Sequence, residues 1–150
     1  MKHLITLLTL INFSLLGQDL SSVDKKVAEI ERYKKYETVR FDSTDLASVS
    51  KDLIETIQYN RKNSGLHKIE IREKIENGFC FRTYYFDKEN LISIREKKYN
   101  GETILVLMNY YFVDNEFVKA LDSKGIDKTN MIDKKELTDR IRKIFALHTE

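Results

Sequence analysis

Alternating apolar and polar residues dominate the middle of the chain. Between residues 67 and 121, short runs rich in β-branched and aromatic side chains are separated by turn-forming residues, a pattern typical of β-strands. The strongest turn signals are Asn77-Gly78 and Asn100-Gly101, because both residue types tolerate the positive φ that a type I′ hairpin turn requires. Residues 87–90 and 114–115 carry weaker turn signals. The pattern predicts five strands, at 67–76, 79–87, 91–99, 103–113 and 116–121.

Short turns force neighbouring strands to run antiparallel, so the simplest topology is a five-stranded β-meander. A two-residue turn at Asn77-Gly78 pairs Glu76 with Phe79 and places Glu73 opposite Arg82 as a cross-strand ion pair. The face that carries this pair is the predicted core face, with Ile69, Ile71, Ile75, Cys80, Tyr84 and Phe86. The unbroken apolar run 104–108 predicts that strand 103–113 is an inner strand covered on both faces.

Apolar residues at helical spacing occur before and after the predicted sheet. Residues 21–37 form the first predicted helix, with Ser21 or Ser22 as its N-cap, and its apolar positions are Val23, Val27 and Ile30. After an extended segment at 39–41, Asp42 or Ser43 caps a second predicted helix over 45–62. Its apolar positions are Leu46, Val49, Leu53, Ile54 and Ile57.

A third helix is predicted over 134–147, where Asp133 and Glu136 resemble a capping box. Its apolar stripe consists of Leu137, Ile141, Ile144 and Phe145. The sheet is the partner against which the three helices can bury their stripes. The sequence therefore predicts an α+β fold, an antiparallel five-stranded β-meander packed with two N-terminal helices and one C-terminal helix.

The N-terminus has the pattern of a secretory signal peptide. Lys2 precedes an apolar run over 4–16, and Gly17 is a small residue before a cleavage site at Gly17/Gln18. The run is short for a membrane span, although a retained anchor and a buried first helix are the alternatives. We therefore expect a signal peptide at 1–17, a single domain at 18–150, a periplasmic or secreted location, and no stable membrane span after cleavage.

Composition argues against several functional classes. The 150-residue chain has a net charge of +2, which argues against a dedicated nucleic-acid binder. Short basic runs such as Arg95, Lys97 and Lys98 are interpreted as solvated faces. The scattered histidines predict no metal site, and the lone Cys80 is expected to face the core. Without a phosphate-binding loop or a catalytic constellation, we expect no cofactor and no enzymatic activity.

Most of the aromatic residues lie between Phe79 and Phe117. They either fill the space between sheet and helices or form a binding surface on an uncovered sheet face. The residues proposed for such a partner face are Phe81, Tyr85, Tyr110, Tyr111 and Phe112.

The segments YYFDKENLISI and NYYFVDNEFVKAL, after a signal and helices, give the chain a resemblance to small exported proteins of Gram-negative bacteria. In outline it also resembles the helix-plus-meander domains of periplasmic interaction modules, such as the PepSY and β-lactamase-inhibitor-protein-like groups. This resemblance implies a periplasmic, non-enzymatic role. The leading hypothesis is an exported module that binds an envelope or secreted macromolecule through its sheet face. The alternatives are a small-ligand carrier or enzyme with a pocket between sheet and helices, and a self-associating structural envelope protein.

Overall fold

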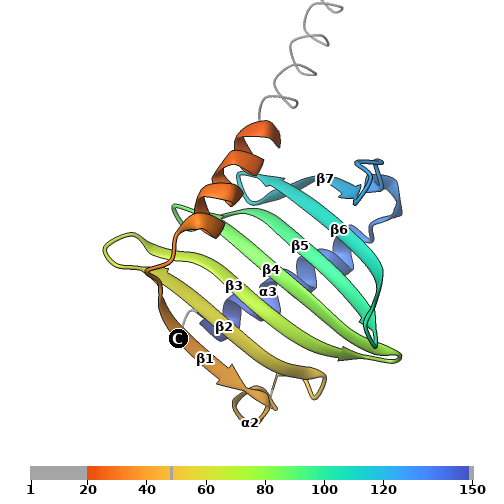
Figure 1. Ribbon diagram of the computed structural model, residues 1–150, viewed down its shortest axis with the longest axis horizontal. Helices are drawn as coiled ribbons and strands as arrows, with labels where there is room; N and C mark the ends of the chain where they lie inside the picture. The colour runs from red at the N-terminus through yellow and green to blue at the C-terminus, as the bar shows by residue number, and fades with distance from the viewer. Residues whose placement is uncertain (1–19, 48, 149–150) are drawn as a thin grey trace, which may run out of the picture.

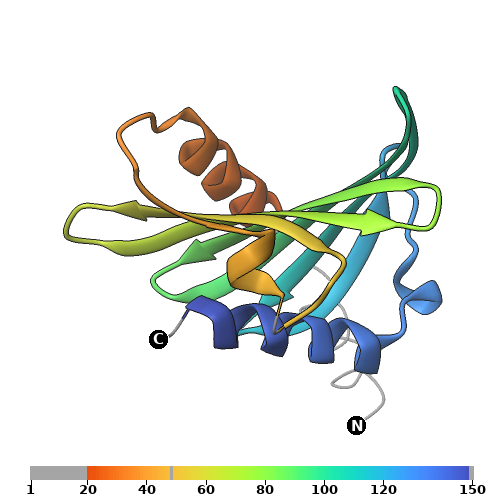
Figure 2. The ribbon, with the colours of Figure 1, turned by 90° about the horizontal axis from the view of Figure 1, so that it is seen from below.

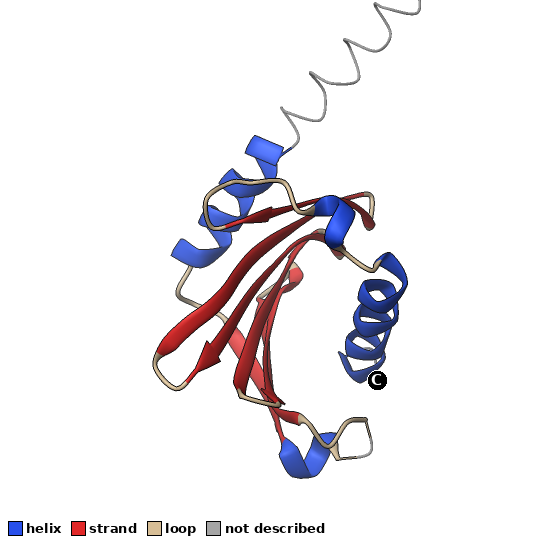
Figure 3. Cartoon of the chain, turned by 90° about the vertical axis from the view of Figure 1, so that its right-hand side faces the viewer, coloured by secondary structure: helices blue, strands red, loops and turns tan. Residues whose placement is uncertain are grey.

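The computed structural model describes residues 20–47 and 49–148, and the predicted signal peptide at 1–17 lies outside them. The fold is α+β: one antiparallel sheet whose strands follow each other in chain order, with a helix against each face (Figures 1 and 3). The strands are β1 (Glu37–Asp42), β2 (Leu53–Arg61), β3 (Gly65–Ile75), β4 (Gly78–Asp87), β5 (Asn90–Asn100), β6 (Thr103–Val113) and β7 (Glu116–Asp122). The helices are the first helix (residues 20–32), α2 (Ser43–Leu46), the 3-10 helix η1 (Thr129–Met131) and α3 (Lys134–His148).

The antiparallel meander is confirmed, and strands β3 to β7 match the five predicted strands to within two residues at each end. The prediction of five strands is wrong in number, because the sheet formed by the described residues has seven. Strand β1 contains the segment 39–41 that was expected to be extended, and it pairs with β2. Both additional strands lie on the N-terminal side of the meander.

The second predicted helix, 45–62, is wrong beyond its first turn. Asp42 does cap it, since its carboxylate accepts a hydrogen bond from Thr44 N at 2.8 Å, but α2 ends at Leu46. Leu53 then begins strand β2, and a bulge between Leu53 and Glu55 disturbs the alternation that would have revealed the strand. Leu46 and Leu53 have the spacing of residues on one face of a helix. Both are buried in the same core, but they belong to different elements, α2 and β2.

The hairpin turns lie at slightly different residues from those predicted. Ile75 pairs with Gly78, so the first turn is Glu76-Asn77, and neither residue has a positive φ. The next Asn-Gly turn is also displaced, to residues 101–102. Positive φ at both central residues, the requirement of a type I′ turn, occurs instead at 88–89 and 114–115. Relative to the prediction, each residue of β3 pairs two positions earlier in β4, for example Glu73 with Cys80. A difference of two residues keeps the same side chains on the core face.

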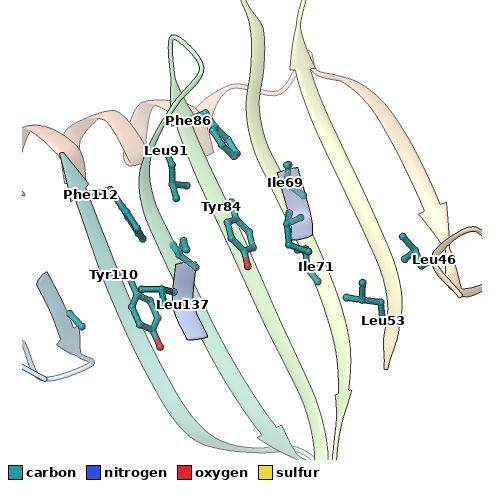
Figure 4. Close-up of a cluster of buried hydrophobic side chains, with 13 residues drawn as sticks. Leu46, Leu53, Ile69, Ile71, Tyr84, Phe86, Leu91, Tyr110, Phe112 and Leu137 are labelled. Atoms are coloured by element: carbon teal, nitrogen blue, oxygen red, sulfur yellow. The ribbon is translucent and has the colours of Figure 1, made fainter. Parts of the chain in front are cut away.

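The larger core lies between the sheet and α3, on what we call the inner face. The sheet curves around α3 in Figure 3, and Figure 4 shows side chains from the strands meeting Leu137 of the helix. The α3 stripe packs as predicted: Leu137 and Ile144 are buried, and Ile141 and Phe145 are partly buried. The largest fully buried apolar side chains of this core are Tyr84, Phe86, Leu46, Ile69, Leu91 and Ile94.

The first helix lies against the opposite face, which we call the outer face (Figures 2 and 3). Val23, Val27 and Ile30 are buried against Tyr85 and Tyr111 of the sheet, as their helical spacing predicted. The helix ends at residue 32 rather than 37. Residue 20 is already helical, so Ser21 and Ser22 lie within the helix and the prediction of an N-cap at either is wrong.

Strand β6 is not covered along its whole length, in contrast to the prediction from its apolar run. Residues 110–112 are buried, but Ile104 is 52% and Leu105 is 55% exposed. Strand β7 pairs with β6 only from Met108 to Val113, so residues 103–107 extend past the end of β7. These residues form a free edge on one side of the sheet (Figure 1).

Candidate functional site

Beyond the end of the first helix, the outer face is uncovered over strands β3, β4 and β5. The uncovered area is hollowed into a groove of about 890 Å³, which reaches from Glu31 of the helix to the turn at Gly101. The size is within the range of about 300–1,000 Å³ that is usual for ligand sites. We call it the outer groove.

Strand register places cations and aromatic rings of the outer groove in rows across the sheet. One row is Arg72, Phe81 and Lys97, on three neighbouring strands. The next row toward the hairpin tips is Lys74, Phe79 and Tyr99, of which the two aromatic residues line the groove. Phe81 is 40% exposed, and its ring meets that of Tyr99 edge-on at 5.5 Å. Each row therefore combines cationic and aromatic groups.

Two arginines of the outer groove, Arg72 and Arg95, lie over aromatic rings rather than against carboxylates. The Arg72 guanidinium is 4.6 Å from the ring centre of Phe79 and 5.6 Å from that of Phe81, and Arg95 is 5.5 Å from the ring centre of Tyr85. Within residues 20–47 and 49–148, neither arginine forms an ion pair, and the buried Arg72 Nε has no hydrogen-bond partner. Because no carboxylate of the described residues neutralises either guanidinium, both positive charges can attract an external anion.

A polar network at the end of the first helix closes one side of the outer groove. The Tyr85 hydroxyl donates to Glu31 Oε1 at 2.7 Å, and Lys68 Nζ lies 3.7 Å from the same oxygen. Burial, followed by this hydrogen bond to a carboxylate, raises the pKa of Tyr85 above its ordinary value of 10.0. Tyr85 therefore remains a neutral donor that fixes the helix end on the sheet.

The five aromatic residues predicted as a partner face do not share one face. Phe81 is exposed in the outer groove, and Tyr85 forms part of its wall. Tyr111 is buried under the first helix, where its hydroxyl donates to Asp24 at 3.2 Å. Tyr110 and Phe112 are buried in the inner core. Only two of the five residues therefore contribute to the outer groove.

The sequence pattern did not indicate Arg72, Phe79 or Tyr99 as site residues, and it predicted that Arg95 and Lys97 belong to a solvated basic run. The spacing of Arg95 and Lys97 contained a usable signal, because residues two apart in a strand lie on the same face. Lys98, the residue after Lys97, belongs to the other face and lies 3.5 Å from Glu96.

Beneath α3, the inner face carries a buried charge network. The Arg82 guanidinium donates from Nε to Glu96 Oε2 at 2.6 Å and pairs with Glu73 through Nη1. Arg140 of α3 approaches the same Glu96 oxygen at 3.5 Å. The predicted pair of Glu73 and Arg82 is confirmed, although Arg82 lies directly opposite Ile71 and reaches Glu73 diagonally.

A second cavity, of about 480 Å³, lies between this network and α3. Its wall includes Tyr84, whose hydroxyl is buried and has no hydrogen-bond partner among the described residues. Burial raises the pKa of Tyr84 to about 12, so the hydroxyl remains protonated. We call this cavity the inner cleft.

The described residues contain no group of three or more His, Cys, Asp or Glu side chains arranged to hold a metal ion. In the same part of the chain, no helix is both long and apolar enough to cross a bilayer. No family model, no curated protein and no solved structure matches this chain.

Proposed function

We propose that this protein is a binding module whose outer groove holds an extended, acidic segment of another protein. The observation that carries the proposal is that Arg72, Arg95 and Lys97 of the groove have no carboxylate partner among the described residues. The exposed ring of Phe81 lies beside two of these cations, Arg72 and Lys97. Arginine donates to a carboxylate through two parallel hydrogen bonds, and an aromatic ring contributes apolar contact area. The combination suits a chain in which acidic and aromatic side chains occur together.

The surroundings of the groove favour a polypeptide over other polyanions. Glu31, Glu70 and Glu102 line its borders and would repel a nucleic acid, which carries a negative charge at every nucleotide, whereas a peptide can place uncharged residues beside these carboxylates and acidic ones beside the arginines. The chain also lacks the large basic excess usual for nucleic-acid binders, with a net charge of +2. Phe79 and Tyr99 are only partly exposed within the groove. A flat bilayer contacts side chains that project from a surface, so these two rings are poorly placed to enter one.

The proposal is tested with a labelled short peptide of alternating Glu and Tyr, titrated with the purified protein and followed by fluorescence anisotropy. We expect binding that weakens as the salt concentration rises. The affinity should fall about tenfold in Arg72→Ala, because one charge-assisted contact is lost, and by a similar factor in Phe81→Ala. Arg142→Ala is the matched control, because Arg142 is 76% exposed on α3, away from the groove.

A Lys-Tyr peptide, a single-stranded oligonucleotide and vesicles containing an anionic lipid are titrated in parallel. Tighter binding of the oligonucleotide or the vesicles than of the Glu-Tyr peptide would assign the groove to a different partner class. Equal losses in Arg72→Ala and Arg142→Ala would show that binding depends on overall charge alone, and the proposal would be wrong.

The inner cleft supports a second candidate function, the binding of a small polar molecule. The unpartnered Tyr84 hydroxyl is the observation that favours it, since buried polar groups are normally hydrogen-bonded. The cleft lining carries equal numbers of acidic and basic side chains, so a neutral molecule suits it better than an ion. Its lining residues include Glu73, Arg82, Asp133, Lys135, Glu136, Asp139, Arg140 and Lys143.

The state of the Tyr84 hydroxyl predicts the effect of removing it. Tyr84→Phe is expected to leave the free energy of unfolding unchanged or to raise it by about 1 kcal/mol, because an unpaired buried hydroxyl is removed. Tyr110→Phe is the matched control: its buried hydroxyl donates to Glu96 Oε1 at 3.4 Å, and its loss is expected to cost about 1 kcal/mol. Urea unfolding followed by circular dichroism measures both. A clear destabilisation by Tyr84→Phe would show that the hydroxyl has a partner, such as a water molecule or a ligand.

A further inference from the structure

The second half of strand β2 carries two amides where the alternation of the strand calls for apolar residues. Gln58 pairs with Ile69 of β3 and Asn60 pairs with Leu66, and paired residues of an antiparallel sheet lie on the same face. Ile69 belongs to the inner core, so both amides lie on the inner face as well. Burying an amide costs free energy unless it is hydrogen-bonded, so the presence of two amides here needs a reason.

Both amides line a cavity of about 380 Å³ between the sheet and the C-terminal end of α3, which we call the terminal cavity. Its other lining residues are Leu66, Ile69, Phe86, Glu89, Phe145 and His148. The wall is mainly apolar, and the ring centres of Phe86 and Phe145 are 5.6 Å apart. An apolar cavity of this size with a few polar groups is typical of a small-molecule site. The terminal cavity shares no lining residue with the outer groove or the inner cleft.

A chain of hydrogen bonds along the wall of the terminal cavity fixes the protonation of His148. Gln58 donates from Nε2 to Asn60 Oδ1 at 2.9 Å, so the amide oxygen of Gln58 is the atom that faces His148. His148 Nδ1 lies 3.0 Å from that oxygen, which can only accept, and Nδ1 therefore carries the proton. Burial lowers the pKa of His148 below its ordinary value of 6.5, so the imidazole is neutral at neutral pH. Nε2 is consequently an acceptor without a proton.

This acceptor, His148 Nε2, is buried and has no hydrogen-bond partner among the described residues. Buried polar atoms are normally paired, so the atom calls for a donor. The ring of Phe41 packs edge-on against the imidazole, with 5.5 Å between the ring centres, and supplies no donor. His148 is the last residue of α3, and helix ends open locally at little cost in free energy. A molecule in the terminal cavity can therefore reach Nε2 through a small movement of the helix end.

We propose that the terminal cavity binds a small aromatic alcohol whose hydroxyl donates a hydrogen bond to His148 Nε2. The aromatic body of such a molecule lies against Phe86 and Phe145, where contacts between rings add to the apolar contact area. A donor is required because Nε2 holds a lone pair and no proton, so a carboxylate or an ether oxygen would be repelled. The exposed Glu89 of the cavity wall also disfavours an anion.

The protonation of His148 is measured first, by two-bond ¹H–¹⁵N correlation spectroscopy of the ¹⁵N-labelled protein at neutral pH. His148→Phe lacks the corresponding signals and thereby identifies them. We expect a proton on Nδ1 and none on Nε2. A proton on Nε2 would remove the acceptor, and the proposal would be overturned.

Binding is measured with 2-naphthol, whose fluorescence is excited with little background because the chain contains no tryptophan. 2-Methoxynaphthalene is the matched ligand, since it keeps both rings and the oxygen but has no hydroxyl donor. We expect it to bind about tenfold more weakly than 2-naphthol, because it leaves Nε2 unpaired. This comparison uses the unmodified protein, so it does not depend on the folding of a variant.

Two variants assign the binding to the terminal cavity. His148→Phe keeps an aromatic ring but loses the acceptor, and its affinity for 2-naphthol should fall about tenfold, to that of the unmodified protein for 2-methoxynaphthalene. Phe81→Ala is the matched control, because Phe81 lines the outer groove, and it should bind 2-naphthol as the unmodified protein does. Circular dichroism verifies that both variants are folded.

The binding data can also overturn the proposal. Absence of 2-naphthol binding up to its solubility limit would assign the acceptor to a bound water molecule instead. Equal affinities for the two ligands would show that the hydroxyl makes no hydrogen bond. Equal losses in His148→Phe and Phe81→Ala would place the binding outside the terminal cavity. None of these outcomes bears on peptide binding in the outer groove, which involves other residues.

Discussion

Replacing Arg82 with Met is expected to lower the free energy of unfolding by about 3–5 kcal/mol. Arg82 is 7% exposed and neutralises Glu96, which is 3% exposed, as well as Glu73. Without the guanidinium, two carboxylates remain close together under α3. Lys98 and Arg140 each approach Glu96 at 3.5 Å, and they compensate only in part because both are more exposed than Arg82. Urea unfolding at neutral pH measures the loss.

The matched control is Arg142→Met, which removes an arginine that pairs with Asp139 at 3.6 Å while being 76% exposed. Because exposed pairs contribute about 0–1 kcal/mol, this variant should unfold close to the wild type. The double variant Arg82→Met with Glu96→Gln removes both members of the buried pair and should recover part of the stability. A loss below about 1 kcal/mol in Arg82→Met would show that the network is more hydrated than its burial implies.

The same network predicts a pH dependence. Burial alone would raise the pKa of the Glu96 carboxyl, but the charge and hydrogen bond of Arg82, with Lys98 and Arg140, outweigh it and hold the pKa below the ordinary 4.5. The contribution to stability is therefore present above pH 4.5 and is lost as the pH falls through the lowered pKa. In Arg82→Met, burial dominates and raises the pKa of Glu96. The difference between variant and wild type should then shrink under acidic conditions.

Gly78→Ala is the second substitution with a large expected effect, about 2–4 kcal/mol of destabilisation from backbone strain and steric overlap. Gly78 has φ +144°, and a Cβ at this position would lie 1.8 Å from the backbone oxygen of Tyr99. The alanine can be accommodated only if β4 and β5 move apart at this point. Thermal and urea unfolding measure the effect.

Gly101→Ala separates the two causes. Gly101 also has a positive φ, +57°, but nothing lies within 4 Å of an added Cβ. Only the left-handed backbone is then unfavourable, at about 1–2 kcal/mol. If the two variants lose equal stability, steric overlap between the added Cβ and Tyr99 contributes nothing, and backbone strain explains both losses.

The strands from β3 onward could be predicted because turn chemistry and side-chain alternation agree there. Strand β2 could not, since its bulge after Leu53 breaks the alternation and its inner positions after Thr56 are polar: Gln58 and Asn60. Ile54, Thr56 and Ile57 are β-branched, a signal that favoured a strand. In this segment the periodicity of apolar residues was misleading, and residue type was the better guide.

The candidate site was predictable only in part. Alternation places Phe81 and Tyr85 on the same face, but it cannot show that the first helix covers one end of that face and leaves the other open. Tyr110, Tyr111 and Phe112 are consecutive, so they could never share a face of a strand. The importance of Arg72 depends on the rings beside it and on the absence of a carboxylate, and both are properties of the folded chain.

The burial of Cys80 has a practical consequence. The side chain is fully buried on the inner face, and burial raises the pKa of its thiol to about 11. Since the thiolate is the reactive species, an alkylating reagent should modify this protein only in molecules that have opened. The labelling rate of the natural thiol thus reports how often the structure around Cys80 opens, without a dye, a tag or an added cysteine.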